Sequence, residues 1–174
     1  MQEIALFKLR LFGDPALRKK ARPVKDITSL QLDILSKMAK TMYAAQGIGL
    51  AAPQVGIDEA MLVIDIGSGL YKLLNPKIIK RKGSQAMEEG CLSVPGVCLK
   101  VRRAKEIVVE AQDESAKPIR IEAEGLLACV FQHEIDHLRG RLIVDYAPFF
   151  ERLSIRKKLA ELSKAETKVC KLQL

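Results

Sequence analysis

Two histidines carry the strongest chemical signal in this sequence. His133 and His137 stand four residues apart in the segment Gln-His-Glu-Ile-Asp-His, and the chain has no other histidine. Residues four apart lie on the same face of a helix, so both imidazoles can reach one divalent cation. Glu134 follows the first histidine and can take a proton from water that the cation activates, then return it. Chance is the alternative explanation, because short motifs also occur without a function.

The two histidines leave a catalytic metal site one ligand short, since such sites usually hold three protein ligands and one open position. Glu151, Glu161 and Glu166 are available by position, but their spacing is typical of a solvated helix face. Cys91 is the stronger candidate because it stands in Glu-Glu-Gly-Cys-Leu-Ser-Val-Pro-Gly, an irregular segment that can expose a thiolate. The alternative for Cys91 is the usual one for a free cysteine, a small buried hydrophobe.

A third segment, residues 47–56, is dense in small residues and reads Gly-Ile-Gly-Leu-Ala-Ala-Pro-Gln-Val-Gly. It does not match a phosphate-binding glycine loop, because no Lys-Ser or Lys-Thr pair follows the glycines. The segment indicates a close approach of the backbone to a substrate, or, alternatively, a tightly packed turn from helix to strand. Gln54 adds a neutral donor that could face a developing oxyanion.

Hydrophobic periodicity predicts three longer helices. The first runs from about residue 28 to 46 and is closed by Gly47. The second, which carries the histidines, runs from about residue 124 to 138, ends at Gly140 and is apolar on two faces, so it is expected to be buried. The third runs from about residue 148 to 165. The residues expected to pack are Ile34, Met38, Met42 and Ala45 in the first helix and Phe149, Leu153, Leu159 and Leu162 in the third.

Short apolar runs predict strands between these helices. Residues 61–66 and 71–74 flank a Gly-Ser-Gly turn, and residues 105–111 and 119–123 read as an antiparallel hairpin. A short helix is expected at Asp14-Pro15. Because strands and helices do not alternate strictly, the predicted class is α+β, with antiparallel sheets packed around the central motif helix and a C-terminal helix.

The whole chain is expected to form one catalytic domain, residues 1–174, in which residues 148–174 are the C-terminal helix and tail. Its 174 residues and 48% hydrophobic content suit a single globular domain. No apolar run reaches the length of a membrane span, and no signal peptide is visible at the start. The four cysteines, Cys91, Cys98, Cys129 and Cys170, therefore read as reduced thiols in a cytoplasmic protein.

The net charge of +8 and the isoelectric point near 9.4 favour acidic partners, although a basic enzyme with no such partner is equally compatible. Much of the positive charge in the last helix comes from Arg152, Arg156, Lys157, Lys158 and Lys164. This helix could dock to ribosomal RNA or protein, or it could simply present a solvated face. We expect neither DNA nor a membrane to be a partner.

The three segments, Gly47–Gln54, Glu89–Ser93 and Gln132–His137, together resemble the peptide deformylases of bacterial type. The resemblance implies that Cys91, His133 and His137 bind one divalent metal ion, with iron(II) expected and zinc, nickel or cobalt as alternatives. It implies that metal-bound water attacks the formyl carbon of N-terminal formyl-methionine in newly made polypeptides, and that formate is released. The implied catalytic groups are Glu134 as general acid and base, with the Gln54 side chain and the Leu92 N–H as oxyanion donors.

The same resemblance assigns the substrate contacts. Ile48, Gly49 and Gly90 would pair with an extended peptide through their backbones, as an added strand does. The pocket for the substrate's first side chain would be lined by Met87, Leu126, Cys129 and Val130. Three positions depart from the family pattern: Pro53 lies inside the first motif, Cys98 stands where relatives carry arginine, and Gln46 stands where an acidic residue is common. Arg102 and Arg103 could supply the missing charge at the rim.

Two other functions compete with this one. The first is a zinc peptidase that cuts peptide bonds, in which Cys91 would not be needed. The second is a binding module with a structural metal, which requires a fourth ligand. Cys129 is the only plausible extra thiol, because it lies one turn before His133 on the same face of the predicted helix.

Overall fold

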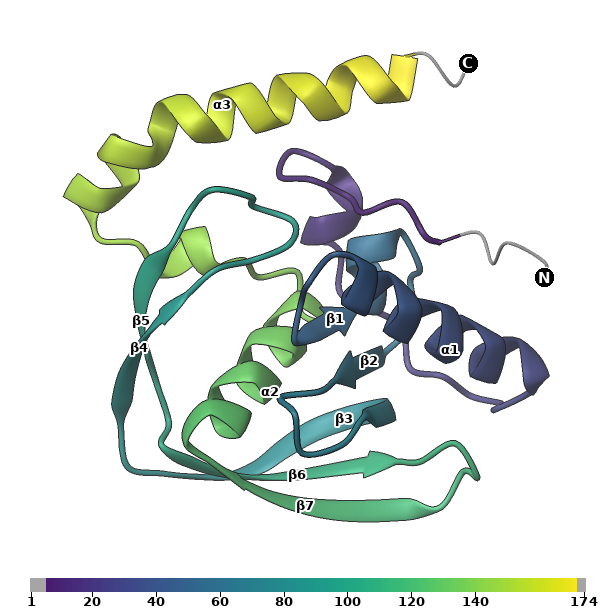
Figure 1. Cartoon of the computed structure of the whole chain (residues 1–174). Helices are drawn as coiled ribbons and strands as arrows, with labels where there is room; N and C mark the ends of the chain where they lie inside the picture. The colour runs from purple at the N-terminus through teal and green to yellow at the C-terminus, as the bar shows by residue number, and fades with distance from the viewer. Residues whose placement is uncertain (1–5, 172–174) are drawn as a thin grey trace.

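Two antiparallel sheets and a central helix form the body of the molecule, as Figure 1 shows. The computed structural model describes the backbone of residues 6–171 and the side chains of residues 6–164. The larger sheet has five strands in the order β1-β2-β3-β6-β7, and the smaller one pairs β4 with β5. The strands are β1 (Gly49–Ala51), β2 (Met61–Ile64), β3 (Tyr71–Lys82), β4 (Gln85–Glu89), β5 (Leu99–Arg103), β6 (Glu106–Gln112) and β7 (Pro118–Glu124).

Helix α2 (Gly125–His137) begins directly after β7 and lies between the two sheets (Figure 1). Every residue from Ala128 to Leu138 is buried, which agrees with the apolar character of its two faces. Phe131 and Ile135 pack against Leu62 of the large sheet in one hydrophobic cluster. The central helix is thus fixed against the large sheet, and so are the histidines that it carries.

Helix α1 (Ser29–Ala44) covers β1 and β2 from the other side (Figure 1). Thr28 and Gln31 form a capping box at its start, where each side chain satisfies a backbone N–H that the helix leaves unpaired. Helix α3 (Phe149–Lys171) crosses the top of the molecule in Figure 1, beyond the small sheet. A 3-10 turn, Pro15–Arg18, is capped by the Asp14 side chain, as the Asp-Pro pair predicts.

The predicted class and arrangement are confirmed: the fold is α+β, and antiparallel sheets enclose the helix that carries the histidines. The predicted hairpin is confirmed: β6 and β7 pair antiparallel, with Ala111 opposite Ile119. Strand β3 continues past the predicted end at Leu74, and the prediction missed this part because its sequence is mainly charged and mostly exposed. The small sheet was not predicted, since β4 and β5 are short and interrupted by charged residues.

Two details of the helices were predicted wrongly. Gln46, and not Gly47, takes the left-handed conformation that closes α1, with φ of 55°. On α1 Met38 and Met42 are buried and Ile34 packs against their cluster, as predicted, but Leu35 and Ala39 complete the buried stripe in place of Ala45, which is only partly buried.

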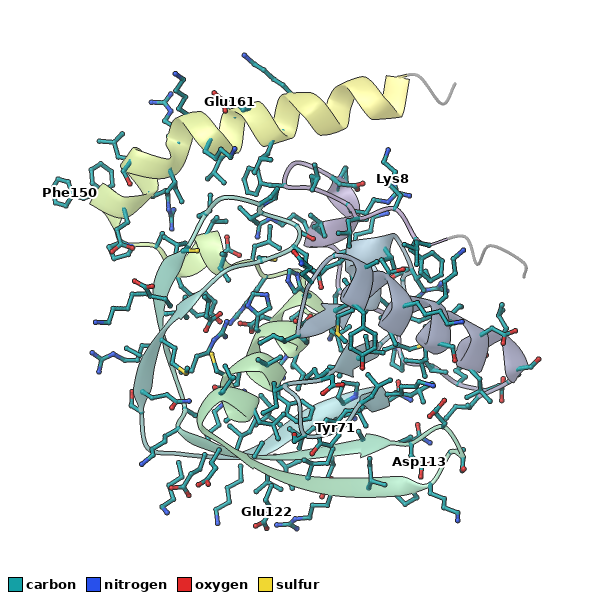
Figure 2. All side chains as sticks on the ribbon, in the orientation of Figure 1. Lys8, Tyr71, Asp113, Glu122, Phe150 and Glu161 are labelled. Atoms are coloured by element: carbon teal, nitrogen blue, oxygen red, sulfur yellow. The ribbon has the colours of Figure 1, made fainter. Side chains whose placement is uncertain are left out.

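The packing face of α3 was predicted correctly at two of its four residues. Leu162 is buried and Leu159 partly so, but Phe149 and Leu153 are 74% and 55% exposed. Phe150 likewise projects from the start of the helix (Figure 2). The helix therefore contacts the body through its middle, and its first turn presents apolar side chains to solvent.

No helix in the described part of the chain is long and apolar enough to cross a membrane.

Gly125 begins α2 and Gly140 follows its end. Substitutions at these two glycines test how tightly the end of the helix is packed. Gly125 and Gly140 both have positive φ, 57° and 72°, but only at Gly140 would an added Cβ meet backbone, the carbonyl of Arg18. Gly125→Ala should lower the free energy of unfolding by about 1 kcal/mol through strain alone. Gly140→Ala should lower it by about 3 kcal/mol, because the clash adds to the strain. Urea denaturation of both variants measures the difference, and equal losses would contradict it.

Candidate active site

The four-residue spacing on α2 brings the two imidazoles together as predicted. The Nε2 atoms of His133 and His137 lie 3.2 Å apart, and both side chains are buried. The side chain of Gln132 fixes the helix against the β5–β6 connection, because its amide both donates to and accepts from the backbone of Ala104 at 3.0 Å. The orientation of the histidines is therefore set by packing and by backbone contacts.

Cys91 reaches the same point from the loop that follows β4. Its Sγ atom lies 3.3 Å from Nε2 of His137, and the ligand atoms of Cys91, His133 and His137 all lie within 4.8 Å of one another. Among the described residues this is the only such group of histidine, cysteine and carboxylate side chains. Glu151 and Glu161 are exposed on α3 and take no part in it, while the side chain of Glu166 lies outside the described residues.

This donor set fits a divalent transition metal. Nε2 of His137 faces both the sulfur of Cys91 and the second imidazole nitrogen, so electron-pair donors converge on one point. One thiolate and two imidazoles are ligands that iron(II), zinc, cobalt and nickel accept. Three protein ligands also leave a position open for water or substrate, as catalytic sites require.

The carboxylate of Glu134 is buried beside the cluster. Its Oε2 atom has no hydrogen-bond partner within the described part of the chain, and the side chain lies against Gly49 of β1. A Cβ at position 49 would overlap the carboxyl group, so any side chain there would displace the Glu134 carboxylate. Burial is the main cause that raises the pKa of Glu134 to about 7; the charge of His133 opposes it, and that of Glu89 adds to it.

Gln54 lies at the end of β1 with its amide turned toward the cysteine. Its Oε1 accepts from the Ala51 N–H at 2.8 Å, which fixes the orientation of the amide. Its Nε2 then donates toward Ser93 Oγ at 3.2 Å and lies 3.7 Å from Cys91 Sγ. Leu92 lines the same cavity. The two predicted oxyanion donors thus border the position where the metal ligands converge.

A ring of buried charges supports the first histidine. Glu89 accepts from Nδ1 of His133 at 2.9 Å and from the guanidinium of Arg103 at 2.7 and 2.9 Å. Arg103 also pairs with Asp136 one turn along α2. A carboxylate on the far nitrogen of a ligating histidine fixes its tautomer and strengthens it as a ligand. Burial alone would raise the pKa of Glu89, but the hydrogen bonds and charges of Arg103 and His133 lower it to about 2.

The thiol of Cys129 belongs to this ring and not to the metal cluster. It donates to Oε1 of Glu89 at 3.1 Å. Burial and the Glu89 carboxylate raise the pKa of Cys129 to about 12, so this side chain stays a neutral thiol. A fourth protein ligand from Cys129, which a purely structural metal site would need, is therefore not supported by the geometry.

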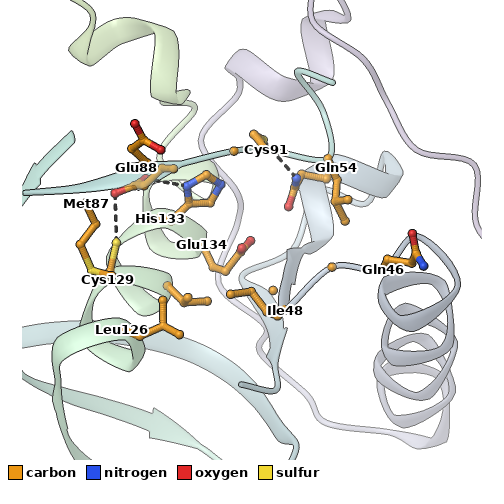
Figure 3. Close-up of a pocket in the computed structure, with 16 residues that line it drawn as sticks. Gln46, Ile48, Gln54, Met87, Glu88, Cys91, Leu126, Cys129, His133 and Glu134 are labelled. Carbon is orange, nitrogen blue, oxygen red and sulfur yellow. Dashed lines mark hydrogen bonds and ion pairs between the residues drawn. The ribbon is translucent and has the colours of Figure 1, made fainter. Parts of the chain in front are cut away.

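A cavity of about 450 Å³ opens beside the cluster (Figure 3). It is bordered by β1 on one side and by the end of β4 on the other, with α2 as its floor. Ile48 and Leu126 remain 45% and 44% exposed at its mouth. Every predicted substrate contact lines this cavity, namely Ile48, Gly49, Met87, Gly90, Leu126, Cys129 and Val130.

The prediction that Arg102 and Arg103 supply charge to the rim was wrong. Arg103 points into the protein because alternate residues of β5 face inward, and its side chain is only 4% exposed. Neither arginine lines the cavity beside the metal cluster. The supporting roles of Glu89, Arg103 and Asp136 were missed. Glu89 stands two residues before Cys91 in the motif, but the partner arginine comes from a strand that the sequence did not predict.

A thiolate, two imidazoles and a free buried carboxylate beside an apolar cavity define the site of a metal-dependent hydrolase. Residues 6–152 match the family model described as polypeptide deformylase. The peptide deformylase of Halothermothrix orenii is 51% identical over 142 residues, which cover 80% of this chain and 92% of the relative. The crystal structure of the Thermus thermophilus peptide deformylase superposes with a TM-score of 0.88 at 41% identity, covering 92% of this chain and 99% of that one.

A third comparison agrees. The crystal structure of a peptide deformylase from Legionella pneumophila has a TM-score of 0.87 at 40% identity and covers 94% of this chain and 98% of that one. The chain belongs to the polypeptide deformylase family, whose members are metal-dependent hydrolases. The resemblance inferred from the three motifs is confirmed. The family match ends at residue 152, so most of α3 lies beyond it.

The charged ring generates a prediction about metal affinity. Glu89→Gln should weaken metal binding about 10- to 100-fold, because the amide cannot hold His133 and Arg103 as the carboxylate does. It should also lower the free energy of unfolding by about 3 kcal/mol, since Arg103 loses one of its two buried counter-charges. Chelator competition and urea denaturation measure the two effects.

The neighbouring carboxylate provides the matched control. Glu88 is exposed on the same strand, so Glu88→Gln should leave both quantities unchanged. Wild-type metal affinity in Glu89→Gln would show that the ring does not support the ligand.

Proposed function

We propose that this chain removes the formyl group from the N-terminal formyl-methionine of newly made polypeptides and releases formate. The observation that carries the proposal is the convergence of Cys91, His133 and His137 beside the carboxylate of Glu134, in a cavity open to an extended peptide. Membership of the deformylase family supports the same reaction. A zinc peptidase does not explain why a cysteine of the Glu-Gly-Cys-Leu-Ser motif joins the histidines.

In this proposal Cys91, His133 and His137 hold one divalent metal ion. A cation there supplies Lewis acidity and lowers the pKa of a water molecule so that it becomes nucleophilic at neutral pH. Iron(II) is the expected metal, while zinc, nickel or cobalt can occupy the same donors. The negative charge of the thiolate leaves the centre less electrophilic than three neutral imidazoles would.

Glu134 handles the proton. Its Oε2 takes a proton from the attacking water and returns it to the methionine nitrogen as the bond between the formyl carbon and that nitrogen breaks. The products are formate and a protonated N-terminal amine, because the acidic proton of the formic acid passes to the amine, so atoms and charge balance. Contact with Gly49 holds the carboxylate in place, because the backbone of β1 leaves the side chain little room to move.

Gln54 and Leu92 stabilise the charge that develops on the formyl oxygen. The amide of Gln54 donates from its Nε2 atom, and Leu92 donates from its backbone N–H. Because the Ala51 N–H already holds the Gln54 carbonyl, the amide is oriented before substrate arrives. Donors fixed in advance cost little reorganisation when charge appears, and each contributes about 10²- to 10³-fold to kcat.

The substrate lies between β1 and the end of β4 as an added strand. Ile48 and Gly49 on one side and Gly90 on the other offer backbone groups to an extended peptide. The methionine side chain enters the apolar part of the cavity. Its walls are Met87, Leu126, Cys129 and Val130, which combine a flexible thioether with small and branched groups.

Formate release from a formyl-Met tripeptide tests the reaction, using protein purified without oxygen and its metal quantified. Wild type should release formate rapidly. Glu134→Gln should retain metal but lose about 10²- to 10⁴-fold in kcat, because proton transfer is removed without disturbing the ligands. Cys91→Ser should lose the metal and with it the activity.

Cys98→Ser is the matched control, since Cys98 is an exposed thiol near the same site and should leave metal content unchanged. No formate release from fully metallated, folded wild type would reject the proposal. Peptide bond cleavage by that protein would favour the peptidase instead.

We further propose that α3 docks to the ribosome, where nascent chains emerge. Arg152, Arg156, Lys157, Lys158 and Lys164 are all exposed on this helix. Its inner contact is limited to residues such as Leu159 and Leu162, so the basic surface is free to meet RNA phosphates. The whole chain, residues 1–174, then acts as one cytoplasmic catalytic domain with a basic C-terminal extension.

Co-sedimentation with ribosomes at increasing salt tests this docking. Wild type should co-sediment at low salt and dissociate as salt rises, because counterions compete for the phosphates. Truncation after Pro148, and Arg156→Glu with Lys157→Glu in the full chain, should both abolish binding. The charge-reversed variant must retain tripeptide deformylation, which separates docking from folding. Equal binding by wild type and both variants would reject the role of α3.

A further inference from the structure

Five arginines line a depression beside α2. This depression lies on a different face of the helix from the histidines. Its volume is about 300 Å³. Arg81 comes from the end of β3, Arg102 from β5, and Arg139 and Arg141 from the turn after α2. Arg103 forms a wall that this depression shares with the charged ring behind the metal cluster. Three separate segments of the chain thus direct guanidinium groups at one hollow.

The carboxylates near this depression already pair with other groups. Asp136 is the only carboxylate in its lining, and it accepts from both Arg103 and the hydroxyl of Tyr146. Asp145, in the turn next to Tyr146, pairs with Arg18 at 2.6 Å. The carbonyl end of α2 is also occupied, because its last carbonyls accept backbone N–H groups of the following turn.

Four guanidinium groups therefore remain without a counter-charge. No ion pair in the described part of the chain involves Arg81, Arg102, Arg139 or Arg141. The side chain of Arg141 hydrogen-bonds to the hydroxyl of Tyr146, which carries no charge to offset its own. Like charges gathered in one concave surface repel each other and raise the local positive potential. A bound anion would relieve this repulsion.

We propose that this depression binds small anions that carry two adjacent phosphate groups. Guanidinium forks match phosphate oxygens with two parallel hydrogen bonds, and four of them exceed what one phosphate needs. The concave shape favours a compact ligand, whereas an extended nucleic-acid backbone would require a stripe of charge. The site is separate from the proposed deformylation chemistry, and its test measures binding alone.

Calorimetric titration with pyrophosphate at low ionic strength tests the proposal on the metal-loaded, full-length protein. Arg102→Ala with Arg139→Ala removes two of the four free guanidinium groups. Arg22→Ala with Arg120→Ala removes the same charge from exposed arginines elsewhere and serves as the control. Wild type and control should bind one pyrophosphate with similar affinity, and the first variant should bind at least about tenfold more weakly. Chelation of the catalytic metal would affect all three proteins alike, so it cannot produce this difference.

Thermal unfolding gives a second measurement that does not depend on the heat of binding. Pyrophosphate should raise the Tm of wild type and control but not of the Arg102→Ala, Arg139→Ala variant. Inorganic phosphate should bind more weakly than pyrophosphate. Equal binding by the three proteins, or none by wild type, would overturn the proposal. Binding of a short RNA without any binding of pyrophosphate would overturn it too, in favour of an RNA contact.

Discussion

The buried guanidinium of Arg103 is the interaction on which the rest of the site depends. It lies between Glu89 at the end of β4 and Asp136 on α2, and its side chain is 4% exposed. A charge this deeply buried is tolerated only when it is paired and hydrogen-bonded, and both carboxylates meet that need. The small sheet is thereby tied to the central helix. Glu89 can then hold His133 because Arg103 holds Glu89.

The side chains that converge at the site come from three places that this arrangement brings together. Strand β1 supplies Gln54 from its following turn, the loop after β4 supplies Cys91, and α2 supplies the histidines and Glu134. Three of these groups are held by a specific contact: Gln54 by a backbone N–H, His133 by the buried ion pair of Glu89 and Arg103, and Glu134 by its close approach to Gly49. Such support is what keeps a catalytic geometry within a fraction of an ångström.

The sequence predicted the helix that carries the histidines, the hairpin of β6 and β7, and the fold class, because regular periodicity and turn residues indicate such elements. Three short motifs predicted which side chains meet at the site. The sequence did not predict Arg103 as their support, since that role requires knowing that β4 and β5 pair and that Asp136 faces them. It also placed Phe149 in the core, because helical spacing shows that a helix has an apolar stripe but not whether a neighbour covers every turn of it.

We propose that one thiolate and two imidazoles form the metal site. X-ray absorption spectroscopy on the metal-loaded protein in solution tests it most directly. The structure predicts one sulfur at ~2.3 Å and two imidazole nitrogens at ~2.1 Å for a zinc-loaded sample, with lighter atoms completing the shell. Loss of the sulfur signal in Cys91→Ser, but not in a Cys129→Ser variant, would assign the thiolate. No sulfur ligand in wild type, or two of them, would contradict the account.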